Sequence, residues 1–365
     1  MSDVAIEVNE RENNPASSQY DRFVGLEHYV SGEVIIRNYG STENLESTMK
    51  VFRSGDILVA RRNVYLKRAS TVDFDGLTSG DSIVLRAKDP TIGRILPFVL
   101  NTDAFWDFAD QYSDGTMSKR LSPKTLMTYE FDLPEEDELE KFADILWAAN
   151  DTRESYQALL RQTDELVKSQ FIEMFGVLES NSKGYPIKSL SEIASYWNGL
   201  TYKPTDTTQD STGILVLRSS NIQNGELAFE DNVRVNCSIK ERLIVQDNDI
   251  LMCSRNGSAA LVGKTALIKD LAEPMTFGAF MMIIRSEYYP FLKTYFDLPA
   301  FRNQISTGTS TINQITGNML NQIRIPTPNI DEVRSFGEFL KQTDKSKYYE
   351  QNRIFSVTRG GELCA

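Results

Sequence analysis

The stretch Gly55-Asp56-Ile57-Leu58 decides the fold, because it returns further along the chain as Asn248-Asp249-Ile250-Leu251. The two aspartates stand 193 positions apart (249 − 56). A repeat of this length is a whole domain with its own core, since solenoid modules have only about 20 to 50 residues. Three further pairs share the offset: Gly32-Glu33 with Gly225-Glu226, Arg62-Asn63 with Arg255-Asn256, and Gly115-Thr116 with Gly308-Thr309. The sequence therefore predicts two similar domains, which suits a ligand with two halves.

The repeat extends on both sides of these pairs with small shifts in register. The segment from Ser2 to Pro15 resembles the segment from Ser191 to Pro204, and Pro134 matches Pro328. Apolar residues follow each proline at helical spacing: Leu139, Phe142, Ile145 and Leu146 correspond to Val333, Phe336, Phe339 and Leu340. The predicted repeating unit is a globular domain followed by a helix.

Each globular part has the pattern of short strands and turns with a helix near its end. In the first copy the predicted strands are 23–26, 33–36, 56–59 and 82–85, followed by a helix from Leu96 to Tyr112. In the second copy they are 215–217, 250–252 and 281–284, followed by a helix near residues 289–305. This order favours a mixed α+β fold over a doubly wound sheet.

The segments after Pro134 and Pro328 have a helical period. Acidic residues 135–138 favour a helix start, because carboxylates are stabilised at the positive end of the helix dipole. A continuous helix of about 40 residues would be about 60 Å long, which suits a spacer or a coiled-coil arm. The second helix is expected from about Asp331 to Arg353 and to end at residues 357–361. We expected this shorter helix to mark a truncation or recombination junction.

These patterns divide the 365 residues into five parts. Two domains are predicted at 1–134 and 182–328. A central helical spacer is predicted at 135–181, a short C-terminal spacer at 329–355 and a tail at 356–365.

Composition excludes several classes of protein. The apolar fraction of 41% is enough for proper cores, and the first residues have neither the basic start nor the apolar run of a secretory signal. We expect a soluble protein that does not enter a membrane. Three scattered cysteines favour a reducing cytoplasm, and a single histidine, His28, excludes most triads and His-rich metal sites. The net charge of −12 requires local basic loops, or partners that supply positive charge, if a polyanion is bound.

The first candidate site is the basic loop after the strand at 56–59. It carries Arg61, Arg62, Asn63, Tyr65, Lys67 and Arg68, and the second copy has Arg255, Asn256, Ser258 and Lys264 at the corresponding place. Arginine pairs with guanine through two hydrogen bonds, asparagine with adenine, and lysine acts as a point charge for phosphate. Solvated turn residues are the alternative, which the recurrence of Arg-Asn in both copies makes weaker.

A second candidate site is the Gly-Thr turn near the end of each domain. Its residues are Thr116, Ser118 and Lys119 in the first copy and Thr309, Thr311 and Asn313 in the second. Small polar side chains beside glycine permit close approach to phosphate or base edges, although an ordinary turn would have the same composition. Ser219, Ser220 and Asn221 pair with the segment of Glu27 and His28 in the first copy, follow a predicted core strand and are also candidates to face a groove.

Motifs of catalysis are missing from the sequence. It has no G-x-x-x-x-G-K-[ST] loop, no G-x-G-x-x-G after a strand and no H-E-x-x-H. It also lacks the Asp/Asn-Pro-Pro-Tyr/Phe box of amino-methyltransferases. We therefore expect a chain that is not itself an enzyme.

The order of these features resembles the specificity (S) subunit of type I restriction-modification systems. The residues that carry the resemblance are 23–28, Gly55–Leu58, Gly115-Thr116, Asn248–Leu251, Gly308-Thr309 and the exit Ile323-Arg324-Ile325-Pro326-Thr327-Pro328. Each motif is weak alone, but their order, spacing and duplication together are specific and cover nearly the whole chain. The first exit has one proline where the second has two, and the second helix is short, which departs from the pattern.

The resemblance implies two target-recognition domains that each read one half of a gapped DNA sequence. It implies helical spacers packed as an antiparallel coiled coil, two modification (methyltransferase) subunits and restriction (translocase and nuclease) subunits as partners. S-adenosylmethionine, ATP and Mg²⁺ are expected on those partners, with no cofactor or metal in this chain, in the cytoplasm of a bacterium or archaeon. Half-sites one helical turn apart lie about 34 Å from each other, which such a spacer can hold.

Two other functions are compatible with the sequence. A coiled-coil scaffold would join proteins through its helices without reading DNA, and replacing Arg62, Asn63, Arg255 and Asn256 would leave its assembly intact. An unrecognised enzyme would require turnover by the isolated chain.

Overall fold

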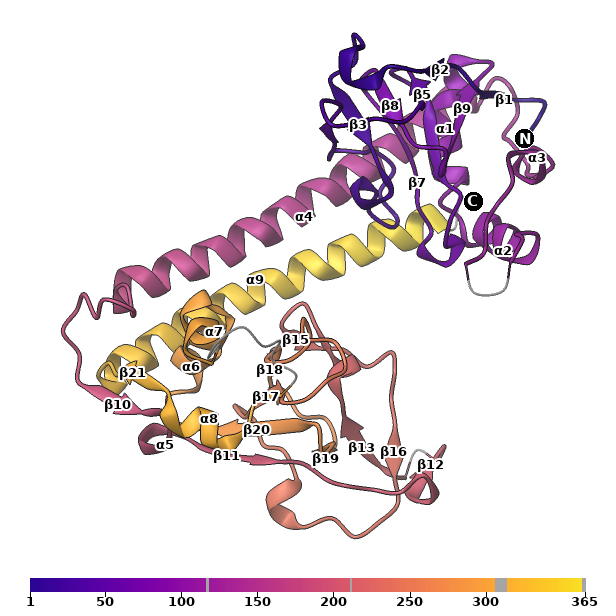
Figure 1. Ribbon diagram of the computed structural model, residues 1–365. Helices are drawn as coiled ribbons and strands as arrows, with labels where there is room; N and C mark the ends of the chain where they lie inside the picture. The colour runs from indigo at the N-terminus through magenta and orange to yellow at the C-terminus, as the bar shows by residue number, and fades with distance from the viewer. Residues whose placement is uncertain (116–117, 211, 306–313, 363–365) are drawn as a thin grey trace. The chain divides into compact units, whose positions relative to one another are not determined.

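A computed structural model describes residues 1–115, 118–210, 212–305 and 314–362, with side chains up to residue 347. The chain divides into two compact units (Figure 1): the first unit comprises Met1–Gln157 with Arg353–Ala365, and the second comprises Ala158–Asn352. This division cuts both long helices. The boundaries of the five parts predicted from the sequence therefore remain a prediction.

The first unit contains two sheets. One has the strand order β1-β9-β6-β7, with every pair antiparallel. The other has the order β2-β5-β8-β3-β4, and its β3–β8 pair is parallel. The bounds are β1 Ala5–Val8, β2 Arg11–Glu12, β3 Arg22–Val24, β4 Gly40–Ser41, β5 Met49–Phe52, β6 Ile57–Ala60, β7 Ala69–Thr71, β8 Gly76–Thr78 and β9 Ser82–Ala87.

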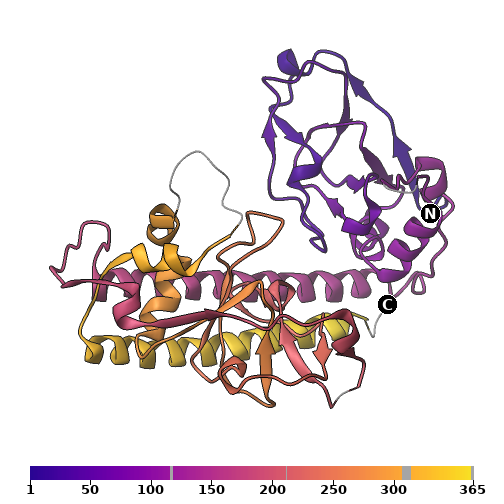
Figure 2. The same cartoon turned by 60° about the horizontal axis from the view of Figure 1, so that its bottom comes forward.

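The second unit also contains two large sheets, and Figure 2 draws the same structure from another side. Its antiparallel sheet has the order β11-β20-β17-β18, and its other large sheet has the order β12-β16-β13-β19, with β13–β19 parallel. Two small sheets are β14-β15 and β10-β21. The bounds are β10 Ile187–Ser189, β11 Ser195–Asn198, β12 Thr207–Thr208, β13 Ile214–Leu217, β14 Ile222–Gln223, β15 Glu226–Leu227, β16 Arg234–Val235, β17 Ile250–Cys253, β18 Thr265–Leu267, β19 Met275–Phe277, β20 Met281–Arg285 and β21 Arg324–Pro326.

The strands β6 and β17 explain why the duplicated motif decides the fold. All four residues of each strand are buried. Ile57 faces one hydrophobic core and Leu58 the other, and Ile250 and Leu251 divide in the same way. A strand buried on both faces is apolar throughout instead of alternating. Each copy of the motif is therefore the strand between two cores.

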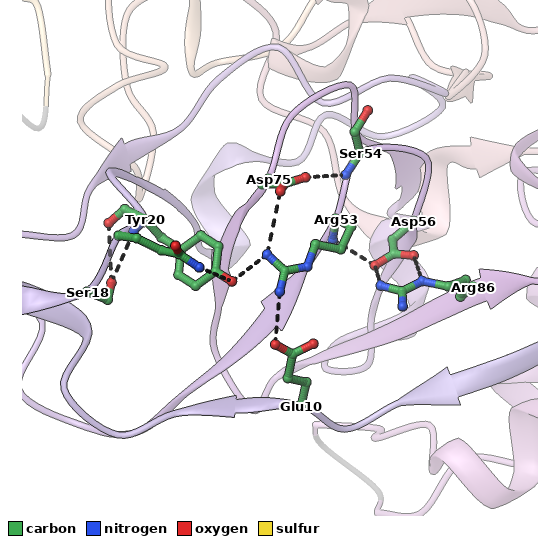
Figure 3. A network of polar contacts seen from close by, with 9 residues as sticks. Glu10, Ser18, Tyr20, Arg53, Ser54, Asp56, Asp75 and Arg86 are labelled. Carbon is green, nitrogen blue, oxygen red and sulfur yellow. Dashed lines mark hydrogen bonds and ion pairs between the residues drawn. The ribbon is translucent and has the colours of Figure 1, made fainter.

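The aspartate at the start of each of these strands is structural. Asp56 is 1% exposed, and its carboxylate accepts hydrogen bonds from the backbone N–H of Arg53 and from the Arg86 guanidinium. Arg53 also pairs with Asp75 and Glu10, so this end of the strand is surrounded by a polar network (Figure 3). The network joins β5, β6 and β9 at their ends.

Seven short helices differ from the sequence prediction or were not predicted. The predicted helix from Leu96 to Tyr112 is two helices, α1 Pro90–Val99 and α2 Asp103–Gln111, because the Thr102 hydroxyl caps a new start by accepting from the Phe105 N–H at 3.2 Å. The corresponding helix in the second unit also breaks, into α6 Tyr289–Asp297 and α7 Pro299–Ile305. Proline at 299 lacks the N–H that would continue α6. The unpredicted short helices are α3 Pro123–Leu126, α5 Leu190–Ile193 and α8 Gly317–Gln322.

Two predicted strands also need correction. Residues 33–36 make only an isolated bridge between Ile35 and Thr71. The strand predicted at 23–26 ends at Val24, and a 3-10 helix follows at Leu26–His28.

The two long helices are α4 Leu139–Phe175 and α9 Ile330–Glu362. The prediction that residues 357–361 end the second helix is wrong, because α9 continues to Glu362. The helix passes through Gly360 and Gly361. Glycine weakens a helix by about 1 kcal/mol but, unlike proline, it keeps its backbone N–H donor.

Within the second unit the two helices pack in opposite directions. Phe171 of α4 contacts Phe336 of α9, with ring centroids 5.6 Å apart. Earlier in α4, Asp164 pairs with Lys347, which lies later in α9. The α+β fold with packed antiparallel spacer helices is therefore confirmed.

Candidate nucleic-acid interface

In the first unit the structure brings together the two segments predicted to read DNA. The loop at Arg61–Arg68 follows β6, and residues 118–121 come after α2 in the chain. The Asn63 N–H donates to the Lys119 carbonyl at 2.9 Å, and the Leu121 N–H donates to the Arg61 carbonyl at 2.8 Å. An isolated antiparallel bridge joins Arg62 to Arg120. Residues 61–68 and 118–121, almost 60 positions apart in the sequence, thus lie side by side. We call this pair of segments the first rim.

The second unit builds the same rim from the loop at Ser254–Ser258. The Ile315 N–H donates to the Ser254 carbonyl at 2.7 Å, and Arg255 bridges to Gln314. Four predicted residues, Thr116, Thr309, Thr311 and Asn313, lie outside the described residues. The remaining parts of both rims show that the sequence repeat is also a repeat of backbone hydrogen bonds.

The first rim presents an amide and two guanidinium groups. Asn63 has a left-handed backbone (φ 54°), and its side-chain oxygen accepts a hydrogen bond from the Ser118 hydroxyl at 3.0 Å. Arg62 pairs with Asp81 at 3.4 Å, and Arg120 pairs with the other oxygen of the same carboxylate. Asp81 was missed in the sequence because it lies on a different loop, before β9.

Several basic residues of the first loop have internal partners. The Arg68 guanidinium donates to the carbonyls of Leu26 at 2.9 Å and Arg62 at 3.1 Å, and therefore supports the loop. Arg61 donates to the Leu121 carbonyl at 3.1 Å, and burial lowers its pKa. The other two pairs are Lys67 with Asp103 and Lys119 with Asp110.

Tyr65 differs from these neighbours because 67% of it is exposed. An exposed ring beside a basic loop can stack on a base or on a sugar.

The second rim has a different set of contacts. The Arg255 guanidinium lies 5.4 Å from the centroid of the Phe280 ring, and Phe280 is 60% exposed. The Asn256 amide donates to the Ser219 hydroxyl at 3.1 Å, and its oxygen accepts from the Ser258 N–H at 2.9 Å. Ser258 is exposed, whereas Lys264 is partly buried. Phe280 was not predicted, although its position before β20 matches that of Asp81 before β9.

Asn221 is a correction to the predicted DNA-binding residues. It is fully buried, and its side chain accepts from the Arg218 N–H at 2.9 Å and donates to the Ala228 carbonyl at 2.9 Å. These bonds cap a 3-10 helix and leave the amide no path to DNA. His28 has the same role in the first unit, because its Nδ1 accepts from the Gly25 N–H at 2.9 Å.

Two other kinds of site are absent from the part of the chain that the structure describes. No group of three or more His, Cys, Asp or Glu residues there is placed to hold a metal ion. No described helix combines the length and the apolar composition that a membrane span requires.

The fold and the paired rims define a class of protein: a duplicated α+β chain with two equivalent loop surfaces and helical spacers. A solved structure of the S subunit of a type I restriction-modification system from M. genitalium has this fold, with a TM-score of 0.53 and 12% identity over 99% of this chain and 92% of that one. At that identity the likeness concerns the fold.

Sequence relatives point to the same class. The EcoKI specificity subunit of Escherichia coli K12 is 29% identical over 177 residues, and the StySPI specificity subunit of Salmonella potsdam is 30% identical over 178 residues. Each match covers 45% of this chain and 38% of the relative. The matched part is thus less than half of either relative. No family model matches the sequence. The resemblance to type I specificity subunits is confirmed by these relatives.

Proposed function

We propose that this chain is the non-catalytic DNA-recognition subunit of a type I restriction-modification complex. It directs adenine methylation and restriction to a DNA target whose two halves are separated by a gap. The observation that carries the proposal is the duplicated rim, in which equivalent Arg-Asn pairs, Arg62-Asn63 and Arg255-Asn256, are held by equivalent backbone hydrogen bonds. The names of the two sequence relatives also support it over a scaffold without DNA readout.

Each rim has the chemistry to read base edges. Arginine can donate two hydrogen bonds to guanine, and an asparagine amide both donates to and accepts from adenine. Most of the other predicted DNA-binding residues support the loops or contribute charge to the rims. Because the chain has a net charge of −12, phosphate contacts on both sides of the target are assigned to partner subunits.

The proposed partners are double-stranded DNA, two modification subunits and the restriction subunits. S-adenosylmethionine, ATP and Mg²⁺ are placed on those subunits, and the complex acts in the cytoplasm. In this proposal the length of the gap in the target depends on the lengths of the helices α4 and α9.

The test is to express the chain with the modification subunit encoded beside it in a host free of adenine methylation. Methylated adenines are then mapped across the genome by single-molecule sequencing. We expect a gapped motif with two parts. The double variant Arg62→Ala with Asn63→Ala relaxes one half of it, and Arg255→Ala with Asn256→Ala relaxes the other, each lost base contact costing about 1 to 3 kcal/mol.

Arg334→Ala is the matched control, because it removes an exposed guanidinium from α9 and from neither rim. It should leave both halves of the motif intact. Methylation that is unchanged in both double variants would contradict DNA reading by the rims and support a scaffold.

A further inference from the structure

The residue immediately before β9 and the residue before β20 occupy one place in the duplicated fold. The Arg61 N–H donates to the Asp81 carbonyl at 2.9 Å, and the Ser254 N–H donates to the Phe280 carbonyl at 2.9 Å. Asp81 and Phe280 are therefore equivalent, although one carries a carboxylate and the other an aromatic ring. Each side chain lies against the arginine of its own rim.

In the first rim one carboxylate offsets part of the charge of two arginines. Asp81 accepts from Arg62 through one oxygen and from Arg120 through the other. The three side chains remain accessible, with exposed fractions of 24% for Asp81, 49% for Arg62 and 45% for Arg120. Ion pairs with this exposure are weak, so an incoming acceptor can replace the carboxylate.

In the second rim the ring holds the arginine without cancelling its charge. The Arg255 guanidinium lies over Phe280, and none of the salt bridges between described residues involves it. A cation over an aromatic face keeps its N–H groups directed outward and available to acceptors. Arg255 is therefore charged and oriented before any ligand arrives.

We infer that Asp81 and Phe280 are positioning residues that determine how the two halves of the target are read. In the first half, Arg62 and Arg120 bind DNA only by exchanging Asp81 for a DNA acceptor. This exchange disfavours DNA that offers phosphates without the correct base. In the second half, Arg255 binds without such an exchange. The inference rests on the proposed function, because it concerns the same two rims.

The test uses the complex with the modification subunits, measured by methylation motif and by DNA binding at several salt concentrations. Asp81→Asn keeps the shape of the side chain and removes its charge. We expect tighter binding to DNA of random sequence, a salt dependence steeper by about one ion, and relaxed preference in the first half only. The control Asp21→Asn removes an exposed carboxylate that pairs with neither Arg62 nor Arg120, and should leave the motif unchanged.

The second half is tested with Phe280→Leu and Phe280→Tyr. Loss of the ring in Phe280→Leu should reduce preference in the second half by about 5- to 150-fold, the range of one base contact. Phe280→Tyr retains a ring face and should retain the preference. Phe280→Asp creates the arrangement of the first rim, and should weaken binding to random DNA without changing the first half.

Three outcomes would overturn the inference. They are Asp81→Asn with unchanged motif and salt dependence, equal relaxation of both halves, and a second half that Phe280→Leu and Phe280→Tyr alter alike. Each of these would leave the proposed function standing, because the wild-type complex would still methylate a gapped motif. A wild-type complex without such a motif would instead overturn the proposed function, and this inference with it.

Discussion

Both oxygens of the Asp249 carboxylate are bound by the Arg285 guanidinium, with Nε–Oδ1 at 2.6 Å and Nη2–Oδ2 at 2.7 Å. Asp56 and Arg86 repeat this geometry in the first unit, at 2.7 Å for each bond. The bonds to Asp249 and Asp56 raise the pKa of Arg285 and of Arg86. The most recognisable residue of the repeat is therefore part of the framework and has no free atom for a ligand.

Asp249→Ala should destabilise the second unit by about 3 kcal/mol. This is the lower end of the cost of breaking a buried pair, because Asp249 is 1% exposed while the Arg285 side chain is 34% exposed. Urea unfolding measures the loss of stability, and hydrogen exchange of backbone amides shows which unit has lost protection. The matched variant Asp56→Ala should act on the first unit instead, and a loss shared equally by both units would contradict this assignment.

Phe336→Ala should cost about 3 to 5 kcal/mol, because it leaves a cavity in a cluster of aromatic rings. Phe336 is fully buried and contacts Phe171 and Phe175 of α4. Leu166→Ala on α4 is the control. Leu166 is 51% exposed, so the change in the free energy of unfolding should stay within about 0.5 kcal/mol. Equal effects of the two variants in denaturant unfolding would show that the helix pairing is not the source of stability.

His28→Asn should keep its stability, while His28→Ala should lose about 1 kcal/mol. The reason is that Asn221 forms the equivalent cap in the second unit, with the same 2.9 Å bond to a backbone N–H. Thermal unfolding of both variants tests this. If asparagine were as damaging as alanine, the histidine would have a role other than capping.

Glu273→Gln should lower stability near neutral pH, and the difference from wild type should narrow as pH falls below 4.5. Hydrogen bonding from Arg234 holds the pKa of Glu273 below its ordinary value of 4.5. A depressed folded-state pKa contributes stability above the unfolded pKa, and this contribution is lost as pH falls through the folded pKa. Chemical unfolding between pH 3 and pH 7 checks it. A gap that stays constant over this range would contradict the role of the ion pair.

Much of the fold could be predicted because duplication and buried strands leave strong signals. The repeated Asp-Ile-Leu motif identified the central strand of each unit, and helical spacing identified α4. Helix ends were less predictable. Thr102 starts a new helix through a single side-chain hydrogen bond, and α9 continues through two glycines that normally interrupt helices.

The parts of the candidate site that come from one continuous segment of sequence could be predicted. Arg62-Asn63 and Arg255-Asn256 lie on the rims, where backbone bridges join Arg62 to Arg120 and Arg255 to Gln314. Asn221 was wrongly included, because a buried cap and an exposed amide look identical in sequence. Asp81 and Phe280 were missed, since their contacts with the arginines depend on a loop that precedes a different strand.

The equivalence of Asp81 and Phe280 has a consequence for how this chain can diversify. A duplicated protein contains two aligned sequences that share one history of folding constraints. Positions with the same buried residue in both copies, such as Asp56 and Asp249, show which side chains the fold requires. Positions with the same backbone bond but different side chains, such as 81 and 280, are free of that constraint. Comparison of the two copies within one chain therefore identifies positions where a side chain can change without a new fold.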